Sequence, residues 1–446
     1  MDAFFGSLNM QNNSYRKQFI EYVSANVMSM IGFSLYVLAD TFFIAKGLGS
    51  NGLAALNLAL PVYNFIEGTG QMIGIGGASM FMIYHIKGNR QKCNEIFTTA
   101  VTTGLFWGFA FLLLGIFCGR KITTLIGADK YVYDMTKTYL SMMLYFAPAF
   151  ILNNTISVFV KNDGEPRLAM MGMLAGSIFN SIFDYVFIFV CNMGIFGAAL
   201  ATICAPIMGL LVLSLHFIRK RHGFTYKVLS YNIHYVATIL SRGVPTLITE
   251  VATGVVMIVF NSLILGLTGN VGVAAYGVIL NVHLVVMSIF NGIAQGSQPL
   301  FSSLQAKKDS VGLKTIFNYA ICAVGIFSVI VYILAFAFPN QLTAIFNSEN
   351  NIMMAQLAVE GFRKYYIGTF FLGCNIVMLL YFVSIGKEQI ALMMSLSRGI
   401  LIILPLAIIL SKLFGMDGIW ITASITEFIV FIAGILYKKY SCNIDL

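Results

Sequence analysis

Charged side chains are scarce in this chain. Asp, Glu, Lys and Arg account for 10% of its 446 residues, whereas 58% of the residues are hydrophobic. Soluble domains typically carry roughly 25% charged residues, so the composition excludes a soluble enzyme or a soluble binding domain. It predicts an all-α, polytopic membrane protein.

The chain also lacks the motifs of nucleotide, metal and disulfide chemistry. It contains no GxxxxGK[ST] phosphate-binding loop, and its 7 cysteines form no CxxC pair and indicate no disulfide framework. A membrane enzyme needs a polar catalytic cluster, which the spread of the histidines disfavours. We therefore expect no enzyme activity, no cofactor and no metal, unless Na⁺ binds at a transport site. Four histidines fall at separate expected helix ends: His85, His216, His222 and His234.

Long apolar runs dominate the chain instead. Each is long enough for a helix across the roughly 30 Å hydrocarbon core of a bilayer, which takes about 20 residues. We predict twelve transmembrane helices near residues 18–45, 52–85, 93–118, 132–160, 167–191, 194–218, 234–265, 271–301, 313–337, 353–384, 388–411 and 417–437.

The basic residues gather on one side of this topology. With a cytoplasmic N-terminus, the inner connections hold 17 of the 27 Lys and Arg residues and the outer connections hold 8. This excess follows the positive-inside rule and predicts that both termini are cytoplasmic. The net charge of +9 is therefore a topology signal, and we expect the lipid bilayer, not nucleic acid, as the partner. The polar segment up to Ser14 has no signal-peptide pattern, so the first apolar helix is expected to direct insertion.

Short segments recur in the same order with an offset of 220 to 222 residues. An even number of helices per repeat returns the second half to the same orientation, so the repeats are expected to be parallel. The matched segments are Gly52–Ala55 with Gly272–Ala275, Gly164–Met170 with Gly386–Leu392, and Gly194–Gly197 with Gly415–Gly418.

The repeats predict two six-helix, pseudo-symmetric lobes. The N-terminal lobe spans residues 1–218 and the C-terminal lobe spans residues 234–446, with a basic cytoplasmic linker at 219–233. Two such lobes enclose a cleft whose mouth can face either side of the membrane. The fold class is therefore typical of a transporter.

Six segments in order resemble the multidrug and toxic compound extrusion family, in particular its bacterial MepA-like and DinF-like branch. The likeness covers essentially the whole chain. It implies twelve helices in two lobes, a bacterial plasma membrane, and antiport of amphipathic, often cationic organic compounds against H⁺ or Na⁺. We expect a monomer. The segments are Ala39–Pro61, Val160–Met170, Asn180–Thr202, Gly243–Gly254, Asn291–Ser302 and Ser384–Ile400.

Two acids in the N-terminal lobe are candidates for ion coupling. Asp40 and Asp184 lie within apolar spans, where a charge at a helix centre costs about 2.5 to 3.5 kcal/mol on insertion scales. The topology places both in the outer half of the lobe, with Asn180 one turn before Asp184 and Thr202 on the next helix. Such a group can hold a proton or a hard cation such as Na⁺. The resemblance carries a coupling site onto Asp40 and Asp184, and the alternative is that both acids only fix helix packing.

A third acid, Glu250, lies in the seventh predicted helix. Related exporters place a cation-site glutamate there, but the tenth helix, Thr369–Ser384, lacks its usual acidic partner. Glu250 is therefore either a counter-charge for a cationic substrate or a structural residue. Arg398 is its possible ionic partner, although an Arg398 that faces backbone carbonyls is the favoured interpretation. The first helix also departs from the family, because Asn26 stands where many relatives have proline.

The substrate cavity is predicted only in outline. Thioether and aromatic side chains suit loosely selective binding of flat cations, and most of the 23 Met residues are expected simply to pack. For His283 we favour a hydrogen-bonded packing role, and Glu427 ranks lowest among the acids. Candidate cavity residues are Glu67, Met72, Tyr139, Asn153, Asn154, His283 and Met287.

A flippase for lipid-linked precursors remains the alternative function. It shares the broader superfamily fold that the resemblance implies. A flippase is expected to line its cavity with several cations and often has fourteen helices. Twelve spans and acidic cavity candidates disfavour it.

Overall fold

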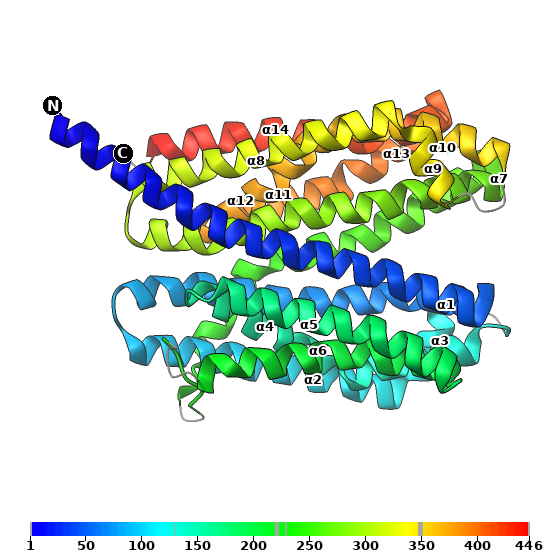
Figure 1. Cartoon of the computed structure of the whole chain (residues 1–446), viewed down its shortest axis with the longest axis horizontal. Helices are drawn as coiled ribbons and strands as arrows, with labels where there is room; N and C mark the ends of the chain where they lie inside the picture. The colour runs from blue at the N-terminus through cyan, green and yellow to red at the C-terminus, as the bar shows by residue number, and fades with distance from the viewer. Residues whose placement is uncertain (1, 129, 219–222, 228–229, 347–350, 445–446) are drawn as a thin grey trace. The chain divides into compact units, whose positions relative to one another are not determined.

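The computed structural model describes residues 2–128, 130–218, 223–227, 230–346 and 351–444. All the regular elements in these residues are helices (Figure 1), so the all-α prediction is confirmed. The elements are α1 (Asp2–Ile86), α2 (Arg90–Leu125), α3 (Tyr133–Tyr145), α4 (Ala147–Asn162), α5 (Pro166–Tyr185), η1 (Val186–Val190), α6 (Gly194–Ile218), α7 (Ile233–Ala306), α8 (Ser310–Ala337), α9 (Pro339–Phe346), α10 (Ile352–Tyr365), η3 (Tyr366–Gly368), α11 (Thr369–Ser384), α12 (Glu388–Leu396), η4 (Ser397–Leu401), α13 (Ile403–Phe414) and α14 (Met416–Ile444).

Ten helices in the described residues are long and apolar enough to cross a membrane. The pair α3 and α4, bent by 49° between Tyr145 and Ala147, makes an eleventh span. The predicted helix at 52–85 is helical to Ile86 but less apolar, because it carries Glu67 and a run of glycines. It is not among the helices in the described residues that are apolar enough to cross a membrane, so the twelfth span stays a prediction.

Glycine joins two predicted helices within α1 and again within α7. Gly49 has φ 69° and ψ −162°, and Gly269 has φ 66° and ψ −158°. Only glycine adopts this region without strain. The two breaks lie 220 residues apart, so the repeat seen in the sequence extends to the backbone.

Helix starts and bends repeat with the same spacing. The Asn89 side chain accepts a hydrogen bond from Lys92 N at the start of α2, and Asp309 accepts one from Gly312 N at the start of α8. These side chains satisfy amide groups that the first turn of a helix leaves free. The break between α3 and α4 at Phe146 also matches the short η3 helix between α10 and α11.

Contacts divide the chain into two compact units. The N-unit comprises residues 24–251 and 302–308, and the C-unit comprises residues 1–23, 252–301 and 309–446. The predicted lobe boundary at 219–233 stays a prediction, and residues 219–222 and 228–229 of that linker lie outside the described residues.

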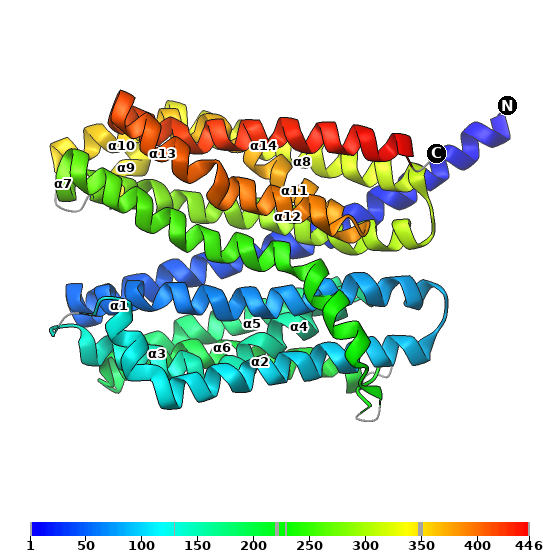
Figure 2. The same cartoon turned by 180° about the vertical axis from the view of Figure 1, so that it is seen from behind.

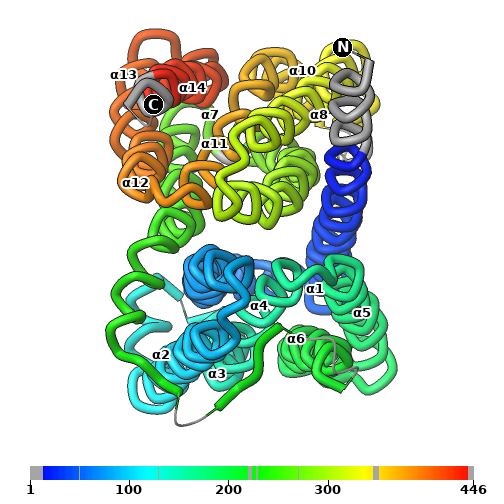
Figure 3. Tube along the Cα trace, turned by 90° about the vertical axis from the view of Figure 1, so that its left-hand side faces the viewer, coloured from blue at the N-terminus to red at the C-terminus, as the bar shows by residue number. Residues whose placement is uncertain are grey.

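Each unit has a central helix. In the N-unit, α4 packs against α2, α5 and α6 (Figure 3). In the C-unit, α11 packs against α8, α12 and α14, and α13 runs beside α14 (Figure 2). All side chains of α11 from Leu372 to Ser384 are buried. A polar residue in this stretch of α11 is therefore kept away from the surrounding solvent or lipid.

Candidate functional site

Asp40 and Asp184 face each other inside the N-unit. Their exposed fractions are 6% and 0%, and the two carboxyl groups lie within hydrogen-bonding range of each other. Among the described residues, no other group donates a hydrogen bond to Asp40 Oδ1 or to either oxygen of Asp184. Two carboxylates this close repel each other in a medium of low dielectric constant. The geometry therefore calls for a proton or a cation between them.

The local helix geometry positions Asp184. This residue is the last but one of α5 and lies two residues before the π-helical turn η1, a feature that often occurs at functional sites. Asn180 precedes it by one turn and so shares its helix face. Asn180 is fully buried, and neither polar atom of its side chain has a partner in the described residues.

Thr202 and Tyr139 complete this polar group. The Tyr139 hydroxyl lies 3.2 Å from Thr202 Oγ1, and Thr202 Oγ1 donates to Ala198 O at 3.0 Å. Tyr139 is also within electrostatic range of Asp40 and Asp184. A residue expected to line the substrate cavity thus lies beside the expected coupling residues.

A second polar group surrounds Glu67 on α1. Asn154 of α4 donates its Nδ2 to Glu67 Oε2 at 2.7 Å. The hydroxyls of Tyr36 and Tyr63 lie 3.2 Å apart and link the two parts of α1. Tyr36 is within electrostatic range of both Asp40 and Glu67, so these tyrosines lie between the two groups. This link could not be predicted, because an aromatic residue in an apolar helix is more often a packing residue.

The other cavity candidates do not all join these groups. Met72 is buried, and a methyl group on Gly243 would overlap its carbonyl, so the helices cross closely there. The Asn153 amide lies over Gly209 of α6. In the C-unit, the His283 ring packs edge-to-face on Tyr365 at 5.3 Å, and Met287 is half-buried.

Arg398 binds Glu427, not Glu250. Arg398 Nη2 and Nε donate to Glu427 Oε1 at 2.8 and 3.2 Å, and Asn375 Nδ2 donates to Glu427 Oε2 at 2.7 Å. The expected pairing of Arg398 with Glu250 is therefore wrong, and so is the alternative in which backbone carbonyls hold the guanidinium. Glu427 ranked last among the predicted acids because spacing along separate helices does not reveal which helix faces meet.

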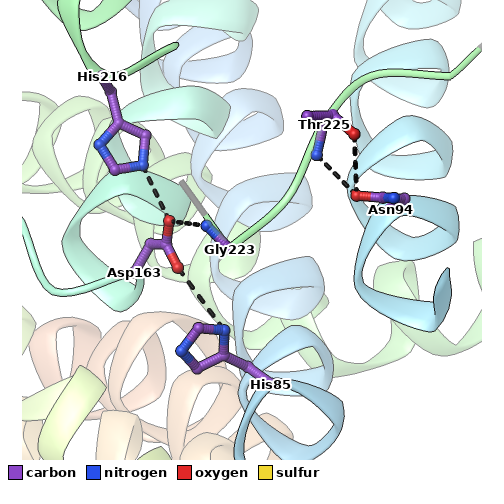
Figure 4. Close-up of polar contacts among 6 residues, drawn as sticks. All are labelled: His85, Asn94, Asp163, His216, Gly223 and Thr225. Carbon is purple, nitrogen blue, oxygen red and sulfur yellow. Dashed lines mark hydrogen bonds and ion pairs between the residues drawn. The ribbon is translucent and has the colours of Figure 1, made fainter. Parts of the chain in front are cut away.

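Two histidines that looked scattered in the sequence converge on Asp163 (Figure 4). His216 Nε2 lies 2.9 Å from Asp163 Oδ2, and His85 Nδ1 lies 3.6 Å from Asp163 Oδ1. The amide of Gly223 donates to Asp163 Oδ2 at 2.7 Å. Asp163 therefore ties α1 and α6 to the start of the described linker.

The linker is fastened to α2 as well. The amide and hydroxyl of Thr225 donate to Asn94 Oδ1 at 2.7 and 3.2 Å (Figure 4), and Lys227 N donates to Thr98 Oγ1 at 3.0 Å. Two of these three donors are backbone amides, which need partners when shielded from water. The arrangement is an anchor for the chain between α6 and α7.

Known proteins match the chain over nearly all of its length. Multidrug export protein MepA of Staphylococcus saprophyticus is 27% identical over 424 residues, covering 92% of this chain and 91% of the relative. The protein of the same name from Staphylococcus aureus strain N315 is 25% identical over 415 residues, covering 90% and 88%.

Solved structures share the fold. The crystal structure of MATE in complex with MaL6 superposes with a TM-score of 0.90 at 20% identity and covers 96% of both chains. The multidrug transporter DinF-BH in complex with R6G gives 0.87 at 24% identity and 94% of both chains.

The MatE family model matches residues 26–186 and 245–409, one stretch in each sequence repeat and together more than half of the chain. With helices that span the membrane and the fold of solved MATE structures, the chain belongs to the MatE family of membrane transporters and is not an enzyme.

Proposed function

We propose that the chain is a secondary active multidrug efflux antiporter of a bacterial plasma membrane. It exports amphipathic, often cationic organic compounds in exchange for H⁺ or Na⁺ by alternating access. The observation that carries this proposal is the buried Asp40–Asp184 pair, whose oxygens lack donors in the described part of the chain. The MepA relatives, named as multidrug export proteins, support the same substrate class.

The coupling ion binds at this pair in the proposed mechanism. Asp40 and Asp184 supply the charge, while Asn180 and Thr202 supply neutral oxygens. One proton or one Na⁺ neutralises the repulsion between the acids and leaves when the site opens to the other side. Moving one charge through the membrane potential yields about 2.3 kcal/mol per 100 mV, and tenfold accumulation of a substrate requires about 1.4 kcal/mol. One coupled ion is therefore sufficient to export an uncharged compound, whereas the exchange of one ion for a monovalent cation moves no net charge and is driven by the concentration gradient of the ion.

The proposed alternating access uses the predicted lobes, residues 1–218 and 234–446, moving as rigid bodies in a monomer with both termini in the cytoplasm. The anchor at Asp163 fixes the linker to the N-unit, so motion between the lobes is absorbed after the anchored segment. Glu250 and the cavity candidates are proposed to face the substrate path.

Purified protein in liposomes tests the proposal. Ethidium efflux is measured with a proton gradient or a sodium gradient imposed separately, and the gradient that drives it identifies the ion. We expect Asp40→Asn and Asp184→Asn each to reduce driven efflux about 100-fold or more, equivalent to about 2.8 kcal/mol. Glu360→Gln, which changes an acid whose side chain is 62% exposed, is the control. Undiminished efflux in both aspartate variants would overturn the proposal, and scrambling of labelled lipid without ethidium efflux would support a flippase.

A further inference from the structure

The chain that follows α6 is seated on the N-unit by a buried aromatic side chain. We call residues 223–227 of this chain the strap. Its Phe224 is 1% exposed and packs at centroid distances of 4.3 to 5.7 Å against four rings, those of Phe81, Phe97, Phe159 and Phe217. Aromatic clusters of this kind bury a large apolar area. The strap is therefore released only when Phe224 leaves its pocket.

Backbone amides of the strap add polar contacts to this seat. The amides of Gly223, Thr225 and Lys227 donate to side chains of Asp163 and α2 at 2.7, 2.7 and 3.0 Å. A hydrogen-bonded amide exchanges its hydrogen with water only when the structure around it opens. The exchange of these three amides therefore reports how firmly the strap is held.

Two histidines contact Asp163 in different ways (Figure 4). His216 Nε2 lies 2.9 Å from Asp163 Oδ2, and both side chains are 1% exposed, so a neutral His216 can hold this contact as an ordinary hydrogen bond. His85 Nδ1 lies 3.6 Å from Asp163 Oδ1, and the His85 side chain is 37% exposed. This distance is longer than a hydrogen bond. His85 is therefore the member of the cluster that solvent protons reach and whose contact with Asp163 can still shorten.

His85 also touches the residues that seat the strap. A methyl group on Gly223 would overlap both Asp163 Oδ1 and the His85 ring, so the strap backbone lies directly against both groups. The His85 ring lies 5.0 Å from the Phe81 ring, and Phe81 meets Phe224 edge-to-face at 5.4 Å. A change of charge on His85 therefore acts on the polar and the aromatic part of the seat together.

Other charged groups near the cluster leave this assignment unchanged. Cys93 is within electrostatic range of Asp163 and of Arg90. Histidine is the side chain that ordinarily changes charge between about pH 5 and pH 8, and none of the neighbouring groups is a histidine. The titratable or charged neighbours on the surrounding elements are Tyr84 and Lys87 of α1, Arg90, Lys92, Cys93 and Glu95 of α2, Lys161 of α4, Glu165 and Arg167 at the start of α5, and Tyr226 and Lys227 of the strap.

The second repeat does not reproduce the cluster. The residues 220 to 222 positions after its three members are Gln305, Ile385 and Tyr437, none of which is a histidine or an acid. Helix caps and backbone breaks do recur at this spacing. The shared architecture of the two repeats therefore does not require the cluster, which belongs to the half that carries the strap.

We propose that His85 and Asp163 form a proton-controlled clamp that regulates the attachment of the strap to the N-unit. Protonation of His85 converts a loose contact into an ion pair with a buried carboxylate, and the pair tightens around Gly223. Attachment is therefore strengthened as the pH falls and weakened as the pH rises and His85 loses its proton. The predicted topology places this end of the N-unit in the cytoplasm, so the clamp responds to cytoplasmic pH.

The consequence for transport rests on the proposed function. The strap is part of the chain that joins the two predicted lobes. A seated strap leaves less free chain between the lobes and so restrains their motion, whereas a released strap lengthens the connection. Acidification of the cytoplasm is therefore expected to slow the transport cycle, and His85 is the residue through which it acts.

Hydrogen exchange of the purified full-length protein tests the clamp itself. Protection factors, which correct each rate for the intrinsic pH dependence of exchange, are measured at about pH 6 and about pH 8 for the three strap amides. We expect the wild type to lose about threefold protection between the lower and the higher pH, because one partly exposed ion pair is lost. The internal control is the amide of Gly312, which donates to Asp309 at 2.9 Å. Asp309 is bonded to Tyr15 rather than to a histidine, so this protection factor should stay constant.

Substitutions identify the group that titrates. His85→Gln should show the weaker protection of the wild type at high pH under both conditions, and Asp163→Asn should also abolish the pH dependence. Gly223→Ala displaces the strap and provides the signal of a released strap. His234→Gln changes a histidine outside the cluster and should retain the wild-type response. A pH dependence that survives in His85→Gln, or that disappears in His234→Gln, would overturn the inference. Constant protection at Gly312 in every variant shows that the fold is intact.

Ethidium efflux from liposomes tests the regulatory role. With the same ion gradient imposed, we expect His85→Gln to export ethidium about twofold to threefold faster than the wild type at about pH 6 on the cytoplasmic side, and equally fast at about pH 8. Equal rates at both values, together with a pH-dependent strap, would overturn the role of the clamp in transport. Failure of the wild type to export ethidium at all would overturn the proposed function, whereas the exchange measurements decide the existence of the clamp in either case.

Discussion

Asn154 and Asn375 occupy equivalent positions in the two repeats, 221 residues apart, and each donates its Nδ2 to a glutamate Oε2 at 2.7 Å. The acids they hold differ. Glu427 in the C-unit also binds Arg398, so its charge is neutralised. Glu67 in the N-unit has Glu250 as its neighbour and no basic partner among the described residues. The same amide therefore supports a closed ion pair in one unit and an uncompensated acid in the other.

This difference separates structural from functional charge. A buried ion pair adds little net stability, but removing one partner leaves an uncompensated charge and is strongly destabilising. Neutralising a buried acid that has no partner has the opposite effect on stability, because it removes the cost of an uncompensated charge. Such a substitution is therefore expected to impair only the function. We therefore expect substitutions in the C-unit to affect stability and substitutions in the N-unit to affect transport.

The largest effect is expected at the ion pair. Arg398→Met leaves Glu427 charged and unpaired, and we expect it to lower the free energy of unfolding by about 3 to 5 kcal/mol. Denaturation of the protein in mixed micelles measures this change. The double variant Arg398→Met with Glu427→Gln removes both charges and should regain most of the loss. A double variant as unstable as the single one would contradict the pairing.

The two asparagines give the most direct comparison between the units. Asn375→Ala removes a donor to Glu427 and to the Glu427 carbonyl, and hydrogen bonds to charged groups contribute about 1.5 to 3 kcal/mol. We expect a loss of stability in this range. Asn154→Ala should lose less stability, because Asn154 is half-buried whereas Asn375 is fully buried, but it should weaken ethidium binding. Equal destabilisation by the two substitutions, without any effect on binding, would contradict the distinction.

At the two glycine breaks, we expect substitution to lower the stability of the two halves of the chain by the same amount. Gly49→Ala and Gly269→Ala force a side chain into a backbone region that costs about 1 to 3 kcal/mol. A methyl group on either residue has no atom within 4 Å, so the whole cost is conformational and should be nearly equal in the two variants. Thermal unfolding of both proteins measures it, with Gly254→Ala, in an open position within α7, as the control. A difference of more than about 1 kcal/mol would show that the turns are not equivalent.

Much of the architecture could be predicted because its signals are local. The length of an apolar run indicates a membrane span, and the repeated segments indicated that the second half of the chain is equivalent to the first. The structure adds matching backbone breaks at Gly49 and Gly269. The proximity of Asp40 to Asp184 followed from topology, since both acids lie at the same depth of one predicted lobe.

Contacts that depend on how a helix is oriented about its own axis could not be predicted. Arg398 and Glu427 are separated by 29 residues, and Asp163 and His216 by 53. In a soluble helix the polar face indicates which side meets the core, but a helix in lipid is apolar on most faces. The sequence therefore placed Arg398 beside the wrong acid and left His85 and His216 apart.

The smallest expected effect on stability has the opposite sign to the others. Asp184→Asn should leave the protein as stable as the wild type or stabilise it by up to about 1 kcal/mol, because the amide removes one of two neighbouring charges and offers a hydrogen bond, worth about that amount, to Asp40. The matched control is Glu427→Gln, which neutralises an acid of the C-unit and leaves Arg398 unpaired; it should lower the melting temperature. Comparing both variants with the wild type by thermal unfolding tests the distinction within one experiment. If Asp184→Asn destabilised the protein as much as Glu427→Gln, the carboxyl pair would be a packing contact and the contrast between the two units would fail.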